Sequence, residues 1–140
     1  MTAQPVESES RRLALRAPLG AAAAGLCAVT LVALVDPNEP GHYPTCPFLS
    51  LTGLFCPGCG SLRAVHALAH GDITAAIGSN VLTVLAVVPL VFLWLRWVRR
   101  SWTGTARTWA APAPALWALL VVLCVFGVLR NLPVGAALAP

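Results

Sequence analysis

The chain has 140 residues, of which 58% are hydrophobic and only 10% are charged, and its mean hydropathy is +0.79. This composition excludes an ordinary soluble domain, a disordered chain and a disulfide-stapled secreted module, because soluble domains carry about a quarter charged residues and stapled modules are far richer in cysteine. The net charge of +4 comes from nine arginines without any lysine, and since most of these flank apolar segments they report membrane topology rather than nucleic-acid binding.

The first predicted membrane helix covers residues 17–35, where Thr30 is the only polar side chain. At about 1.5 Å per residue, such a helix matches a hydrocarbon core of about 30 Å. A basic tail, residues 1–16, precedes it. A cleavable signal peptide is the alternative interpretation, but no convincing small-residue cleavage site follows before Asp36.

Two further membrane helices are predicted at residues 81–98 and 112–130, with a basic loop at 99–111 between them. Pro89 lies inside the first of these helices and predicts a kink. Tryptophans cluster at the junction of the two helices, which is typical of an interfacial aromatic belt; they are Trp94, Trp97, Trp102, Trp109 and Trp117.

The arginines also predict orientation. The N-terminal tail and the loop at 99–111 are basic, whereas the long loop at 36–80 carries Arg63 as its only arginine. By the positive-inside rule, the N-terminus is cytoplasmic, and the long loop and the tail at 131–140 lie outside the cell membrane. We therefore expect an all-α membrane protein with three transmembrane helices, a partly re-entrant cysteine-containing loop and short interfacial helices.

The long loop carries the chemistry, because it holds Cys46, Cys56 and Cys59. The run Cys-Pro-Gly-Cys-Gly resembles half of a zinc knuckle, in which two thiols around a tight turn face one ion. Cys46 could be a third ligand, and His42, His66 or His70 the fourth. Zinc is one candidate cofactor, although the sequence leaves the cofactor undetermined.

Two other uses of these cysteines stay open. The first is thiol–disulfide chemistry outside the cytoplasm. A Cys-x-x-Cys at a helix start favours the thiolate, and Arg63 would add to that effect. A purely structural bridge that pins the loop and leaves one inert thiol is the other. Cys27 and Cys124 lie inside predicted membrane helices and are interpreted as packing residues.

Residues 61–70 have helical composition, followed by Gly71 as a C-terminal cap and Asp72 as the N-cap of a short helix over residues 73–79. If the first helix begins near Pro57, one of its faces carries the four residues Cys59, Arg63, His66 and His70. If Ser61 is its N-cap, Cys59 leaves that face. The possible supporting site residues are therefore Arg63, His66, His70 and Asp72, although a histidine there can also simply face water or lipid headgroups.

These residues carry a resemblance. Cys46-Pro47, the segment from Leu51 to Ala64 and His70-Gly71-Asp72 resemble the small bacterial membrane proteins of domain of unknown function family 2752, with its C-P-x-C-G-x-T-R motif. The chain departs from that pattern at Leu62, where the family often has Thr, and at Val81, where it often has Pro. The resemblance implies a multipass membrane protein whose motif residues form its defining site, and it implies no activity.

We interpret the chain as an integral membrane protein with an extracytoplasmic cysteine site for a metal or for thiol–disulfide exchange. The alternative is a non-enzymatic assembly subunit with a bridge-pinned loop, whose alanine-rich helices pack against a membrane-protein partner. An enzyme that holds a lipid or cell-wall phosphate at Arg63 and uses His66 or His70 as base is the weakest of the three interpretations, because it lacks a second carboxylate or nucleophile beyond Asp72. The expected partner in every case is the lipid bilayer, with no nucleic acid.

Overall fold

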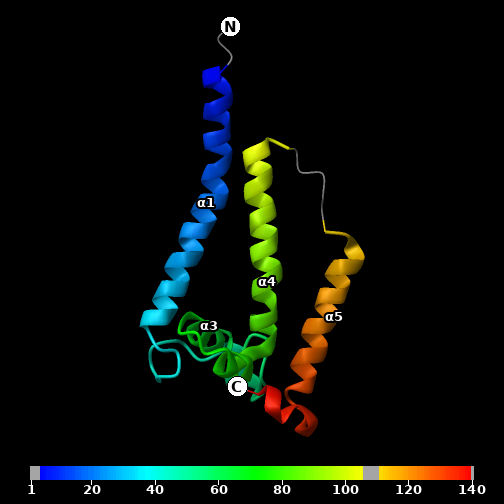
Figure 1. The fold of residues 1–140 in the computed structure, drawn as a ribbon. Coiled ribbons are helices and arrows are strands. Elements are labelled where there is room, and N and C mark those ends of the chain that lie inside the picture. Colours follow the sequence, from blue (N-terminus) through cyan, green and yellow to red (C-terminus); the bar gives the residue numbers. More distant parts are fainter. Residues whose placement is uncertain (1–3, 106–110, 140) are drawn as a thin grey trace. The chain divides into compact units, whose positions relative to one another are not determined.

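The structure is a computed structural model that describes residues 4–105 and 111–139. Its elements are α1 (Gln4–Leu34), α2 (Pro47–Thr52), α3 (Ser61–Ala69), α4 (Ile73–Thr103), α5 (Ala113–Leu129) and the 3₁₀ helix η1 (Pro133–Leu138) (Figure 1). No strand occurs among the described residues. The prediction of an all-helical protein is therefore confirmed for this part of the chain.

Two of these helices are long and apolar enough to cross a membrane: Arg12–Leu34 within α1 and the whole of α4, with mean hydropathies of 2.0 and 2.2. Their apolar windows are 11% and 0% buried, so the protein itself does not cover these side chains. A soluble core helix would be covered, and a bilayer provides the missing apolar surroundings. The helices thus indicate a membrane protein. The third apolar helix, α5, has 17 residues.

The chain divides into two compact units. The first contains the described residues of Met1–Ala28 and Val87–Ala110, and the second contains Val29–Ala86 and those described in Ala111–Pro140. Within the first unit, the Trp94 indole Nε1 donates a hydrogen bond of 3.0 Å to the carbonyl oxygen of Pro18. This hydrogen bond links α4 to α1 at Pro18, a residue that has no backbone N–H of its own to donate within the helix.

Small side chains and helix caps shape the second unit. Ala64, Ala67 and Ala76 are buried, which lets α3 and the start of α4 approach closely. The carboxylate of Asp72 accepts a hydrogen bond of 2.8 Å from the backbone N–H of Ala75, so Asp72 is an N-cap as its position predicts.

An interruption follows within α4. Asn80 has extended backbone angles (φ −165°, ψ 97°) between helical residues, and its side-chain oxygen accepts a hydrogen bond of 3.1 Å from the N–H of Thr83. Asn80 therefore caps the long part of α4, as expected for a residue that opens a membrane helix. Pro89, where the sequence predicts a kink, lies inside that long part.

Candidate functional site

The three loop cysteines converge in the second unit. The Cys56 sulfur lies 3.5 Å from that of Cys46 and 3.2 Å from that of Cys59, and all three sulfurs lie within 4.8 Å of one another. Cys46 comes from the N-cap of α2, while Cys56 and Cys59 come from the turn before α3. All three are free thiols in the structure.

A tight turn brings Cys56 and Cys59 together. The N–H of Cys59 donates 3.1 Å to the carbonyl of Cys56, which closes a turn over Pro57 and Gly58. Gly60 follows with φ 81°, a left-handed conformation that suits glycine, and it is the N-cap of α3. Because α3 begins at Ser61, Cys59 lies outside the helix. Neither predicted helix start is met, since the helix begins after Pro57 and its N-cap is Gly60 and not Ser61.

Arg130, the C-cap residue of α5, donates hydrogen bonds to the backbone of this turn. Its Nη1 donates to the carbonyl oxygens of Cys56 at 2.9 Å and Cys59 at 3.0 Å, and its side chain is only 2% exposed. The guanidinium carbon lies 5.0 Å from the centre of the Phe126 ring and 5.8 Å from that of Phe55. A buried cation therefore lies directly behind the thiol-bearing turn.

Two asparagines complete the support. Asn80, 1% exposed, donates from Nδ2 to the carbonyls of Pro57 at 2.9 Å and Cys59 at 3.0 Å. Asn131 pairs with both backbone groups of Phe55: its Nδ2 donates to the carbonyl and its Oδ1 accepts from the N–H, each at 2.8 Å. The loop thus has its backbone groups satisfied by side chains from α4 and from the end of α5.

Sequence reasoning missed this support. Arg130 lies at the end of the helix predicted at residues 112–130, and nothing in the sequence assigned Asn80 or Asn131 a role beside the cysteines. The usable signal was Arg130 itself, an arginine outside the two basic regions that explain most of the charge.

The thiols differ in acidity. A backbone hydrogen bond from Leu49, in the first turn of α2, is the main cause that lowers the pKa of Cys46. Burial raises the pKa of Cys59 to about 11. The cysteine with the more acidic thiol is thus the one at a helix start, while the buried member of the Cys-x-x-Cys stays protonated at neutral pH.

A cavity of about 650 Å³ adjoins the thiols. Cys46, Cys59 and Arg63 all line it, together with the loop that follows α1. Arg63 is exposed and makes no hydrogen bond or ion pair with the described residues. An external ligand therefore has a route to the sulfur atoms past a cation.

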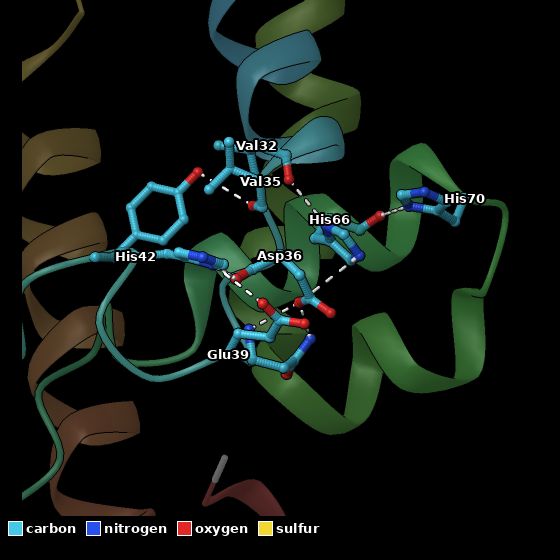
Figure 2. Close-up of polar contacts among 9 residues, drawn as sticks. Val32, Val35, Asp36, Glu39, His42, His66 and His70 are labelled. Atoms are coloured by element: carbon cyan, nitrogen blue, oxygen red, sulfur yellow. Dashed lines mark hydrogen bonds and ion pairs between the residues drawn. The ribbon is translucent and has the colours of Figure 1, made fainter.

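The histidines gather at a different place, the end of α1 (Figure 2). His66 donates from Nδ1 to the carbonyl of Val32 at 2.8 Å, and its Nε2 lies 3.8 Å from the carboxylate of Asp36. His70 contacts the carbonyl of His66 and stacks its ring 4.4 Å away from that of His66, and His42 contacts the backbone of Asp36.

Among the described residues, the sulfur cluster contains none of these histidines and no carboxylate. The two remaining cysteines, Cys27 and Cys124, are exposed on α1 and α5, and neither belongs to the cluster. The structure thus brings three of the predicted site residues together, whereas His66, His70 and Asp72 have hydrogen-bond partners away from the sulfur cluster.

The comparison with protein families agrees with the motif. Residues 46–94 match the family model described as "Protein of unknown function (DUF2752)", which confirms the resemblance read from the cysteine motif. The match contains the three clustered cysteines and Asn80, and it ends before Arg130. No curated protein and no solved structure matches the chain.

Proposed function

We propose that this membrane protein binds a thiophilic metal ion, Zn(II) or Cu(I), through Cys46, Cys56 and Cys59. The observation that carries the proposal is the convergence of three thiols from two segments within 4.8 Å. Sulfur ligands about 2.3 Å from a tetrahedral zinc ion are about 3.8 Å apart, close to the sulfur separations of 3.2 and 3.5 Å here. Thiolate ligands select Zn(II) and Cu(I) over hard cations.

The surroundings support a site with one open position. Three thiolates and a divalent ion leave one net negative charge, and the buried Arg130 lies on the other side of the turn to offset it. The cavity beside Cys46 and Cys59 gives an external ligand access to the ion. A closed structural site uses four protein ligands, whereas a site with three protein ligands and an open position suits metal capture or transfer.

Thiol–disulfide exchange is the second candidate, because the Cys56 sulfur lies within 3.5 Å of both other sulfurs and can pair with either. The Cys46 thiolate would attack an external disulfide and release one thiolate. The Cys56 thiolate would then attack the Cys46 sulfur, form the Cys46–Cys56 bond and release the second thiolate. The protein pair is oxidised by two electrons and the external disulfide is reduced.

Both candidates share one topology. We propose that α5 is a third membrane helix, that the N-terminus is cytoplasmic and that the cysteine loop is extracytoplasmic and partly re-entrant in the cell membrane. The arginine distribution supports this orientation. A membrane-impermeant thiol reagent applied to intact cells, after reduction and chelation, should label a variant that keeps only Cys56. Labelling that requires lysis would reverse the orientation.

The decisive experiment measures metal content and oxidation state in full-length protein purified in mild detergent without oxygen. Mass spectrometry should find about one zinc or copper ion per chain in the wild type. Cys46→Ser, Cys56→Ser and Cys59→Ser should lose the ion, whereas Cys27→Ser and Cys124→Ser, which remove thiols outside the cluster, should keep it.

The same experiment separates the alternatives. A metal-free protein that is lighter by two hydrogens, with the bond mapped to Cys56, would support exchange chemistry instead. Metal-free, reduced protein in which the cysteine variants keep normal abundance and function would end both candidates and favour a subunit that packs its helices against a membrane partner.

A further inference from the structure

One cavity of the second unit connects the cysteine cluster with a cation. Its volume is about 650 Å³, and Cys46, Cys59 and Arg63 all line it. Small-molecule sites in proteins measure about 300–1,000 Å³. The cavity therefore has the size of a site for a small ligand, and a ligand inside it can meet both sulfur atoms and a guanidinium group.

Arg63 has no partner within the described part of the chain. Its side chain is exposed, and it makes no hydrogen bond or ion pair there. Glu39 is the one acidic residue among the described residues of the cavity wall, and its carboxylate lies 3.5 Å from Nδ1 of His42 instead. An exposed arginine is often simply hydrated, but this one shares a wall with two of the three clustered cysteines. The charge is thus available to an anionic group of a ligand that also reaches the thiols.

The cysteine cluster leaves one metal position for such a ligand. Three thiols supply three of the four ligands that a tetrahedral zinc ion takes. The cavity reaches the ion's surroundings at Cys46 and Cys59. A thiophilic ion also prefers sulfur at its remaining position. The ligand that matches this wall therefore combines a sulfur atom with an anionic group.

We propose that the external ligand of this site is a small thiol that carries a carboxylate. The inference rests on the proposed metal function. The sulfur binds the ion as a thiolate, with its proton released to solvent, and the carboxylate pairs with the planar fork of Arg63. Four thiolates around a divalent ion carry two net negative charges, which Arg63 in the cavity wall and the buried Arg130 behind the turn offset.

The test titrates zinc-loaded, full-length protein in a neutral detergent without oxygen. The probes are 3-mercaptopropionate, which has both groups, 3-mercapto-1-propanol, which lacks the carboxylate, and propionate, which lacks the thiol. Calorimetry should show that 3-mercaptopropionate binds at least about tenfold more tightly than either of the others. Native mass spectrometry should find protein, zinc and 3-mercaptopropionate in one complex. The preference should fall as the salt concentration rises, because Arg63 is exposed.

Variants of Arg63 test the second contact. Arg63→Gln should lower the affinity for 3-mercaptopropionate to that for 3-mercapto-1-propanol, and Arg63→Lys, which keeps the charge but loses the fork, should lie between. Arg16→Gln makes the same change at an exposed arginine outside the second unit, and this matched control should keep the wild-type preference. Equal affinities for the two thiols in the wild type, or a preference that survives in Arg63→Gln, would overturn the ligand assignment and leave the zinc site standing. The comparison on the wild type decides the question even if Arg63→Gln fails to fold.

Two further outcomes separate this inference from the proposed function. Wild-type protein that holds no metal would overturn both. A 3-mercaptopropionate adduct on metal-free protein that a phosphine removes would be a mixed disulfide, formed when the thiol opens a protein disulfide, and it would replace metal binding by exchange chemistry. L-cysteine and glutathione both combine a thiol with a carboxylate, so their competition with 3-mercaptopropionate distinguishes a free amino acid from a peptide thiol. Competition by neither would contradict the proposed ligand class.

Discussion

Arg130 and Cys59 are 71 residues apart in the chain, and the Nη1 of Arg130 donates a hydrogen bond of 3.0 Å to the carbonyl oxygen of Cys59. The Nε and Nη2 of Arg130 are buried and have no hydrogen-bond partner among the described residues. A buried cation is stable only where negative charge lies close by. The charge of Arg130 therefore links the stability of the turn to the ionisation of the thiols beside it.

The first prediction concerns that charge. Arg130→Met should weaken metal binding by at least about tenfold and lower the thermal midpoint, because hydrogen bonds from a charged donor are worth about 1.5–3 kcal/mol each. Arg130→Lys should fall between wild type and Arg130→Met. Calorimetric zinc titration in detergent measures the affinity. Arg16→Met, the same change at an exposed arginine outside the unit that holds the cysteines, is the control, and an unchanged affinity in Arg130→Met would contradict the coupling.

The second prediction concerns Asn80. Asn80→Asp keeps the shape but replaces an amide donor by a carboxylate that faces the carbonyls of Pro57 and Cys59. Each lost partner of a buried group costs about 1–3 kcal/mol, so the thermal midpoint should drop clearly. Thr74→Asp adds a carboxylate at an exposed position of α4 whose side chain makes no hydrogen bond with the described residues, and it should have little effect. Similar midpoints for the two variants would refute this role of Asn80.

The third prediction concerns the contact between α5 and the turn. A Cβ added at Gly127 would lie 3.1 Å from Cγ and 3.4 Å from Cδ of Pro57, closer than side chains normally pack. Gly127→Ala should therefore displace the turn and weaken metal binding, and Gly127→Val should do so more strongly. Gly25→Ala, where nothing lies within 4 Å, should instead be stabilising by about 0.5–1 kcal/mol. Normal metal affinity in Gly127→Val would disprove the close approach.

The fourth prediction concerns thiol reactivity in reduced, metal-free protein. The thiolate is the reactive form, so a lowered pKa increases the reactive fraction at neutral pH and a raised pKa decreases it. Cys46 should be alkylated first. At pH 8 Cys59, with a pKa of about 11, is ionised to roughly one part in a thousand, and its rate should rise about tenfold per pH unit. Peptide mapping after timed iodoacetamide treatment measures both rates, and faster alkylation of Cys59 would contradict the assignment.

The fifth prediction concerns the loop after α1. Hydrogen bonds from the backbone and side chain of Asn38 lower the pKa of Asp36. A carboxyl whose pKa is lower in the folded state stabilises the fold above its unfolded pKa and loses that effect as the pH falls through the folded value. The thermal midpoint should therefore decline below about pH 4 in the wild type, and less so in Asp36→Asn. Identical pH profiles for the two proteins would rule out this contribution.

Much of the architecture followed from local pattern. The apolar runs around residues 17–35 and 81–98 predicted helices because an apolar segment without charges has one stable form in lipid. Asp72 and Asn80 were predictable as caps because a cap needs only neighbours along the chain. The closeness of Cys56 and Cys59 was also local, since a turn of four residues fixes it. The histidines were not, because their position on one face of α3 left open what that face would meet.

By itself, the sequence determined a helical membrane protein, the loop that carries its chemistry and the Cys-x-x-Cys within it, because periodicity, caps and turns depend on residues near one another in the chain. Only the tertiary structure decided that Cys46 joins the pair, that His66 turns to the end of α1 and that Arg130 holds the turn from behind. These contacts join distant segments, and their geometry depends on how small residues such as Gly127 let the segments approach. Spacing along the chain carries no information about such approaches.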